Sequence, residues 1–140
     1  MSTESVSARF FAALKRGDQD QMCALLHPGF TVTEANGLPY AGVYHGPAGW
    51  KTLCRNVVKT WKKFNIDLLE LVLETDTTVV IRFSISGRSS RTDREFHSTV
   101  LELWRIQDGK ILEILPYYWD THRLTEVHGG PPTDVGRPPP

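Results

Sequence analysis

The sequence has no excess of either charge. Among its 140 residues, sixteen Lys and Arg balance sixteen Asp and Glu, so the formal net charge is zero. Proteins that bind nucleic acids, and polybasic membrane modules, need clustered positive charge to compete for phosphate groups. The balance therefore predicts a protein that binds neither nucleic acid nor a membrane surface.

Long apolar runs, targeting signals and most cysteines are missing too. The longest apolar stretches, such as Val79–Ile81, fall far short of the ~20 residues of a membrane-spanning helix. The first five residues have neither the basic nor the apolar region of a signal peptide. Cys23 and Cys54 each lie in an amphipathic helical pattern, which favours free thiols in a reducing cytosol over a disulfide. We therefore expect a cytoplasmic protein.

Signature motifs for metals and nucleotides are also absent. No CxxC, HExxH, Walker A or GxGxxG pattern occurs, and no His or Cys cluster has metal-ligand spacing. We therefore expect no cofactor and no metal. What the sequence does have is a globular composition that is 10% aromatic, with four Trp, four Tyr and six Phe. That content fits either an aromatic-lined cavity or a compact core.

Helical periodicity marks the first part of the chain. Residues 3–16 predict one helix that ends at Gly17, and Asp18 is placed to cap a second helix over residues 19–26. A third helix is predicted from Pro47 to about residue 62, because apolar residues recur there at helical spacing. These are Trp50, Leu53, Cys54, Val57, Val58 and Trp61.

The period then changes to that of strands. Phe30–Glu34 predicts a short strand, and Leu38–Gly46 a loop rich in Gly and Tyr. Four further strands are expected over Ile66–Glu74, Thr78–Gly87, Glu95–Ile106 and Ile111–Trp119. Three helices followed by an antiparallel meander predict a single α+β domain over residues 1–128. Residues 129–140, rich in Pro and Gly, predict a flexible tail.

Four sequence motifs in this order resemble the nuclear transport factor 2-like superfamily. They are Arg9–Asp18 in the first helix, Tyr40–Pro47 before the third, Asp108–Ile111 at the last hairpin and Tyr117–Asp120 at the end of the last strand. The branches resembled are the ketosteroid isomerases and the SnoaL-like polyketide cyclases. The resemblance implies a cone-shaped α+β barrel with a curved mixed, mainly antiparallel sheet. It also implies an apolar pocket for a hydrophobic small molecule, and a homodimer formed through the sheet face away from that pocket.

Asp120 and Glu102 are the first two candidates for acid/base catalysis. Strand alternation places Asp120 on the face of Leu112, Ile114, Pro116 and Tyr118. By resemblance, an acid after this aromatic run is the general acid/base of the cyclases; the alternative is a helix cap for residues 121–127. Glu102 lies between Val100 and Trp104, near the position of the isomerase acid that stabilises the enolate. Its alternative is an ion pair with Arg82 or Arg105.

Glu34 and His97 complete the predicted catalytic set. Glu34 matches the position of the isomerase's general base, yet the neighbouring Asn36-Gly37 turn favours a solvated residue at a strand end. His97 is the one histidine predicted inside a strand, and a histidine can transfer protons near neutral pH. Alternation places it opposite Glu102, so both would face the pocket only across a bulge, and a surface or satisfied histidine is favoured.

Five aromatic residues are the candidates for substrate binding. They are Tyr44, Tyr118, Trp104, Phe10 and Trp61. Tyr44 precedes the third helix, where the family's loop borders the cavity, although its ring could simply pack there. Helical spacing alone would also explain Trp61 as core. Phe10 stands where the isomerase has a hydrogen-bonding Tyr, so steroid isomerisation by that mechanism is not expected.

Three functions remain open on the sequence alone. The first is a cofactor-independent cyclase or isomerase that uses carboxyl acid/base chemistry on a polyketide-like or other apolar carbonyl or epoxide compound of secondary metabolism. The second is a ligand-binding or association module without chemistry, since this fold hosts both. The third is an epoxide hydrolase with an Asp-Arg-Asp set, of which Arg82-Phe83-Ser84 retains the Arg and lacks the carboxyl.

Overall fold

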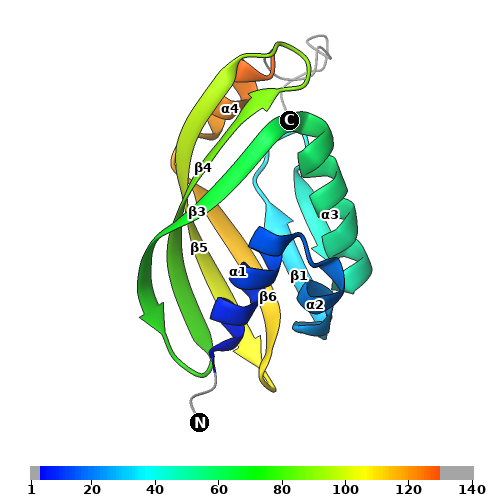
Figure 1. The fold of residues 1–140 in the computed structure, drawn as a ribbon, viewed down its shortest axis with the longest axis vertical. Helices are drawn as coiled ribbons and strands as arrows, with labels where there is room; N and C mark the ends of the chain where they lie inside the picture. The colour runs from blue at the N-terminus through cyan, green and yellow to red at the C-terminus, as the bar shows by residue number, and fades with distance from the viewer. Residues whose placement is uncertain (1–3, 130–140) are drawn as a thin grey trace.

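Four helices and six strands follow one another along residues 4–129, which are the residues that the computed structural model describes (Figure 1). In chain order they are α1 (Val6–Arg16), α2 (Gln19–Ala24), β1 (Leu26–Glu34), β2 (Gly42–His45), α3 (Gly46–Thr60), β3 (Trp61–Glu74), β4 (Thr78–Ser89), β5 (Glu95–Gln107), β6 (Lys110–Tyr118) and α4 (Thr121–Val127). The three helices expected before the meander are present, and α4 follows it.

Local sequence signals explain where the first helices begin and end. The Ser5 hydroxyl caps α1 by accepting a hydrogen bond from the Ala8 amide. Gly17 ends that helix in the left-handed conformation, with φ of 71°. Asp18 then caps α2 through the Gln21 amide, as its position in the sequence predicts. A proline in the first turn opens α3.

The six strands form one mixed sheet in the order β2-β1-β6-β5-β4-β3. Strands β3 to β6 make the predicted antiparallel meander. The parallel contact is between β1 and β6, where Val32 lies beside Ile114. This pairing brings the N-terminal strand next to the last strand of the meander, so residues far apart in sequence share one wall.

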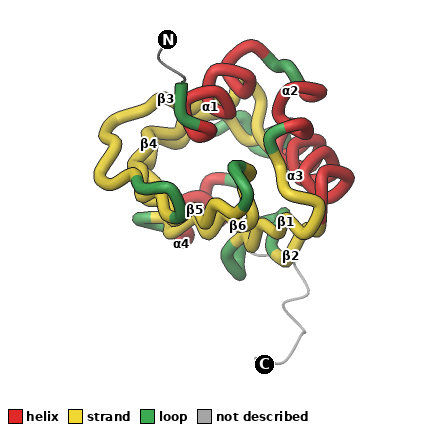
Figure 2. The backbone as a smooth tube through the Cα atoms, turned by 90° about the horizontal axis from the view of Figure 1, so that it is seen from below, coloured by secondary structure: helices red, strands yellow, loops and turns green. Residues whose placement is uncertain are grey.

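The sheet curves around the helices and does not close on itself. Viewed along the long axis, α1, α2 and α3 lie on one side and the strands bend around them (Figure 2). Buried apolar residues fill the space between the two layers, among them Phe10, Trp50, Phe83 and Trp104. At Gly49 the backbones of α3 and β2 are so close that a Cβ atom would lie 2.9 Å from the Tyr44 carbonyl carbon. The predicted cone-shaped α+β fold is thereby confirmed.

Several boundaries differ from the sequence-based expectation: α2 ends at Ala24 and not at residue 26, and β3 starts at Trp61 and not at Ile66. The segment Leu38–Gly46 contains a short strand, β2, which pairs with β1 from Thr31↔His45 to Glu34↔Gly42. Strand β1 also starts earlier, at Leu26, with a register irregularity before Thr31. Strand β2 forms through its pairing with β1, and the early part of β1 pairs with β6. The local sequence therefore gives little indication of either.

None of the helices within residues 4–129 is long and apolar enough to cross a membrane. Cys23 and Cys54 are both free thiols, as their helical contexts predict. The predicted flexible tail lies, except for Gly129, outside the described residues.

Candidate functional site

A cavity of about 280 Å³ lies between the helices and the concave face of the sheet. Its wall is largely apolar and combines α1, α3 and all strands except β2. This volume is near the lower end of the range for ligand sites, about 300–1,000 Å³. Two glutamates and two tyrosines interrupt the apolar wall: Glu34, Glu102, Tyr40 and Tyr118. The cavity is therefore suited to a small apolar molecule that is handled by a few polar groups.

Glu34 lies at the end of β1 with 7% of its surface exposed. The Tyr118 hydroxyl donates a hydrogen bond of 2.8 Å to its Oε1 atom. Burial raises the pKa of Glu34 from 4.5 to about 7, while the Tyr118 hydrogen bond opposes the rise and the nearby Glu102 carboxylate adds to it. The solvated strand end favoured by the sequence is thus wrong, and Glu34 belongs to the pocket.

Glu102 lies in the middle of β5, between Val100 and Trp104 on the inward face. Its Oε1 atom accepts a 2.8 Å hydrogen bond from the Trp104 indole Nε1. Its side chain is half-buried and lines the cavity. Burial raises the pKa of Glu102 from 4.5 to about 7, against the opposing effect of the Trp104 hydrogen bond.

Neither arginine proposed as an ion-pair partner of Glu102 takes that role. Arg82 is exposed and lies 3.6 Å from Glu70. Arg105 is also exposed, and it donates to the Thr78 hydroxyl. Within the residues that the structure describes, no arginine lines the cavity. The Asp-Arg-Asp set of an epoxide hydrolase is therefore not assembled around Arg82.

Strand register places the two glutamates on either side of one proline. Glu102 is directly opposite Pro116 on β6, and the parallel pair Val32↔Ile114 brings Glu34 alongside Pro116 from the other strand. Because neighbouring strands lie about 4.8 Å apart, the two glutamate Cα atoms are separated by roughly 10 Å. Both side chains reach into the same cavity, so a small molecule against this wall would meet both carboxyls.

Buried tyrosine side chains lie next to Glu34 in the cavity wall. Tyr40 is 3% exposed, and its hydroxyl accepts a 2.9 Å hydrogen bond from Nε1 of Trp61. Burial raises the pKa of Tyr40, and the neighbouring Glu34 carboxylate adds to this. Burial likewise raises the pKa of Tyr118 well above its usual value. Both phenols therefore keep their protons and act as hydrogen-bond donors near neutral pH.

Four of the five predicted substrate-binding residues lie in or directly behind the cavity wall. Phe10, Trp104 and Tyr118 line it. The rings of Phe10 and Trp104 meet edge to face with centroids 5.5 Å apart. Trp61 is 1% exposed and lies behind Tyr40, outside the lining itself. It therefore acts on the pocket through the Tyr40 hydroxyl and not by direct contact.

Tyr44 is the fifth predicted binding residue, and its expected position is wrong. Its hydroxyl donates to the Tyr40 backbone carbonyl at 2.8 Å and accepts from the Asn56 amide at 3.3 Å. Both partners hold the ring between β2 and α3, outside the cavity lining. The close approach of α3 at Gly49 explains why the ring packs there.

Asp120 was expected to extend the inward row of β6, and this geometry is also wrong. The row itself is correct, since Ile114, Pro116 and Tyr118 line the cavity. The strand ends at Tyr118, however, and Asp120 is the exposed N-cap of α4. Its Oδ1 atom accepts a 2.9 Å hydrogen bond from the Arg123 amide. The alternative reading, a helix cap, describes its position.

His97 likewise lies outside the cavity. Strands β4 and β5 pair without a register shift from Thr78↔Arg105 to Arg88↔Glu95, so no bulge turns His97 inward. Its side chain is exposed, as simple alternation from Glu102 requires. The pocket therefore contains two of the four predicted catalytic residues, Glu34 and Glu102.

The mouth of the cavity was not predicted from the sequence. Lys15 and Asn65 are exposed residues in the lining, where the end of α1 meets the start of β3. Lys15 donates to the Ile66 carbonyl at 3.0 Å and to Asp67 at 2.9 Å, which ties the helix to the strand. The apolar helical periodicity of α3 does anticipate the wall opposite, which includes Trp50, Leu53 and Val57. Periodicity identifies an inward face but does not distinguish a cavity wall from packed core.

Comparison with known proteins agrees with this architecture. Residues 7–114 match the family model described as SnoaL-like domain. An NTF2-like protein from Burkholderia thailandensis is similar in structure, with a TM-score of 0.81 and 29% sequence identity, over 90% of this chain and 95% of that one. No curated protein sequence matches the chain.

Two more distant structures share the fold and were crystallised with small molecules. A protein with a ketosteroid isomerase-like fold from Catenulispora acidiphila, in complex with trimethylamine, has a TM-score of 0.72 and 14% identity, over 99% of this chain and 100% of that one. TerC, co-crystallised with polyporic acid, has a TM-score of 0.77 and 18% identity, over 88% of this chain and 95% of that one.

Proposed function

The chain belongs to the SnoaL-like domain family, and we propose that it is a cytoplasmic isomerase or cyclase that transfers protons on an apolar carbonyl compound. One observation carries this proposal: two glutamates with raised pKa values share an apolar cavity. A carboxyl whose pKa is near the working pH is an efficient proton donor or acceptor. The size and apolar wall of the cavity support a small hydrophobic substrate of the polyketide kind that secondary metabolism makes.

The two carboxyls would share one proton near neutral pH. Like charges in a poorly solvated cavity disfavour double ionisation, and the Glu102 charge does raise the pKa of Glu34. We assign the negative charge to Glu34, because the Tyr118 hydroxyl donates to it and the Tyr40 hydroxyl lies in the same wall. Glu102 then holds the proton. One carboxylate and one carboxylic acid thus lie next to each other on the sheet wall of the cavity.

This pair can carry an enolisation in which atoms and charges balance. Glu34 takes a proton from the carbon next to the carbonyl, and the electron pair of that C–H bond forms the C=C bond of the enol. Glu102 donates its proton to the carbonyl oxygen. In an isomerisation, Glu34 returns its proton to a different carbon of a conjugated enol while Glu102 takes back the enol hydroxyl proton. In a cyclisation, the enol carbon attacks a second carbonyl of the same molecule, whose C=O π electrons move to its oxygen; Glu34 protonates that oxygen, and Glu102 takes back the enol hydroxyl proton. Proton transfer of this kind requires no group beyond the two carboxyls.

Deuterium exchange on a small ketone tests the proposal without knowledge of the natural substrate. The probe is 2-tetralone in D2O, followed by NMR at the carbon between the ketone and the ring. We expect the protein to accelerate exchange over buffer, and Glu34→Gln to lower the rate by ~10²-fold. Glu102→Gln should lower it as well, by weakening the stabilisation of the enol oxygen.

The control is Asp120→Asn, which removes a carboxylate outside the cavity and leaves a residue that can cap α4. Its exchange rate should equal that of the unmodified protein. If the protein does not accelerate exchange, or if neither glutamine variant differs from the control, the proposed chemistry is wrong.

The other candidate is a binding module without chemistry. Phe10 favours it, because this residue lines the cavity from α1 and offers no hydrogen bond to a substrate oxygen. The structures with polyporic acid and trimethylamine show only that proteins of this fold hold small molecules. Binding of 2-tetralone without any exchange would select this candidate.

We also propose that two copies associate through the outer face of the sheet. Four paired residues make an apolar row across β3, β4, β5 and β6: Leu73, Val80, Leu103 and Leu115. The next row adds Leu101 and Tyr117, which are 40% and 57% exposed. Apolar surface of this extent on an outer sheet face favours burial against a second copy.

A further inference from the structure

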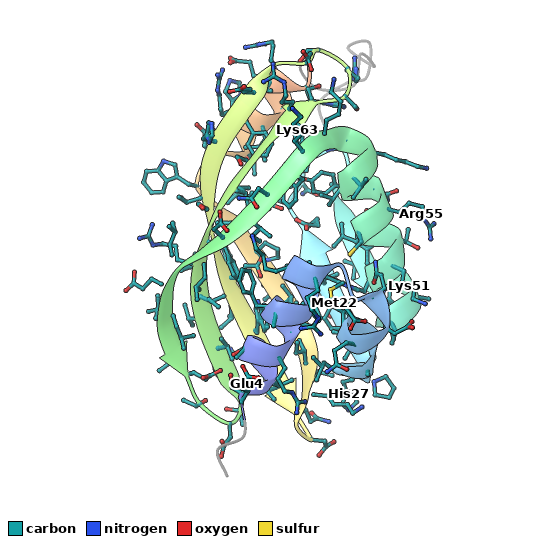
Figure 3. The ribbon with its side chains drawn as sticks, viewed as in Figure 1. Glu4, Met22, His27, Lys51, Arg55 and Lys63 are labelled. Atoms are coloured by element: carbon teal, nitrogen blue, oxygen red, sulfur yellow. The ribbon has the colours of Figure 1, made fainter. Side chains whose placement is uncertain are left out.

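Next to the mouth of the cavity, helix α3 presents three cationic side chains. Lys51, Arg55 and Lys59 follow one another at four-residue spacing, so they form a stripe about 12 Å long on one side of the helix. All three are exposed. Figure 3 shows Lys51 and Arg55 on the side of α3 turned away from the sheet. A chain with zero net charge thus concentrates positive charge at this place.

Within the described part of the chain, these three cations form no ion pair. Among residues 4–129, no carboxylate lies within 4 Å of Lys51, Arg55 or Lys59. The other cation at the mouth, Lys15, is already paired with Asp67. An anion near the mouth would therefore be attracted to the cationic side chains of α3, because the charge of Lys15 on α1 is already balanced by Asp67.

The stripe lines a shallow surface groove that shares two lining residues with the cavity. The groove is formed by Gln19, Lys51, Cys54, Arg55, Val58 and Lys59. Cys54 and Val58 also line the cavity itself. Helical geometry explains this double role, because these two residues lie between the cationic stripe and the apolar face of Trp50, Leu53 and Val57. A ligand that fills the cavity and extends past Cys54 and Val58 would reach the cationic stripe.

We propose that the natural ligand is an apolar molecule that carries an anionic group, a carboxylate or a phosphate. The apolar part fills the cavity, and the anion lies in the groove against Lys51, Arg55 and Lys59. A guanidinium and two ammonium groups suit either anion. This inference deepens the proposed function, because it rests on the same cavity and names the class of substrate.

Binding of three matched naphthyl probes tests the inference. They are 4-(2-naphthyl)butanoate, 4-(2-naphthyl)butyl phosphate and the neutral 4-(2-naphthyl)butanamide, titrated at low ionic strength and about pH 8. We expect at least one anionic probe to bind about tenfold more tightly than the amide, and salt to reduce this preference. The two anionic probes show which anion the groove prefers.

Two triple variants isolate the cationic stripe. Lys51→Ala, Arg55→Ala and Lys59→Ala combined should reduce the preference to about twofold or less. The charge-matched control combines Arg91→Ala, Arg94→Ala and Arg123→Ala, which removes three exposed cations outside the groove. That control should keep the preference. Thermal unfolding of both variants verifies that each is folded.

The outcomes separate this inference from the enolisation chemistry. If the amide binds as tightly as both anions, if none of the probes binds, or if the two triple variants behave alike, the inference is overturned. Exchange of 2-tetralone, a neutral probe, would be unaffected by that failure. An anion preference lost only in the Lys51–Arg55–Lys59 variant would support the inference even if no exchange occurs.

Discussion

At the scale of single residues, Glu34 and Glu102 carry a stability cost that follows from their burial. In the folded protein the pKa of each is raised from 4.5 to about 7, chiefly because burial disfavours the charged form. Between these two pH values the unfolded chain releases protons that the folded protein retains. The free energy of unfolding therefore decreases as the pH rises from about 4.5 to 7, and it levels off above that range.

Glu34→Gln should relieve this cost at one site. At about pH 8 we expect the variant to exceed the unmodified protein in free energy of unfolding by about 2 kcal/mol. The difference should shrink toward zero near pH 4.5, where the glutamate is protonated in both states. Urea unfolding at several pH values measures it.

Glu4→Gln is the matched control, because it removes an exposed carboxyl just before α1. It should change the stability by less than about 0.5 kcal/mol at any of these pH values. A Glu34→Gln variant that is no more stable than this control at about pH 8 would contradict the raised pKa.

Sequence patterns selected two glutamates that line the cavity but did not predict their surroundings. Alternation along β5 places Glu102 on the inward face, and the structure agrees. Glu34 precedes an Asn-Gly turn, so its neighbours in sequence predict a solvated side chain. In the fold, however, the hydroxyl of Tyr118, 84 positions later, donates a hydrogen bond to it. The error at Asp120 has another cause, because alternation was extended two residues past the end of β6. Local sequence alone did not mark where that strand stops.

At the scale of elements, α4 depends on the cap that Asp120 provides. The helix has seven residues, and the Asp120 carboxylate satisfies the Arg123 amide in its first turn. We expect Asp120→Ala to lower the free energy of unfolding by about 1 kcal/mol, measured by urea unfolding. The exchange of 2-tetralone by the folded protein should not change.

Asp120→Asn separates the cap from the charge, because asparagine also caps helices well. It should retain most of the stability that alanine loses. A large loss of exchange activity in this variant, with stability intact, would instead return Asp120 to the catalytic set.

Elements with strong periodicity were predictable, and short ones were not. Helix α3 and the long strands β3 to β6 repeat their apolar pattern over several turns or pairs. Strand β2 has four residues, of which Gly42 is one, and it exists through its pairing with β1. The parallel contact of β1 with β6 has no local sequence signature at all.

At the scale of the whole molecule, the outer sheet face predicts a dimer. Leu103→Glu combined with Leu115→Glu places two like charges side by side in the apolar row of Leu73, Val80, Leu103 and Leu115. We expect the unmodified protein to have the mass of two chains by light scattering, and the double variant to have the mass of one. Buried unpaired charge disfavours association strongly enough to shift the equilibrium by several orders of magnitude.

Val43→Glu is the control for this test, because Val43 on β2 is 52% exposed and lies outside the row. It should leave the dimer intact. A monomeric mass for the unmodified protein at micromolar concentration would exclude the proposed association.

The cavity has a mechanical consequence for the protein as a whole. Protein atoms leave a cavity of about 280 Å³ inside the fold, and unfolding removes the part of it that solvent fills loosely, so the unfolded chain with its water occupies less volume than the native protein. Hydrostatic pressure therefore drives the native state toward unfolding. A molecule that fills the space removes part of that volume difference, so the occupied protein resists compression better than the empty one.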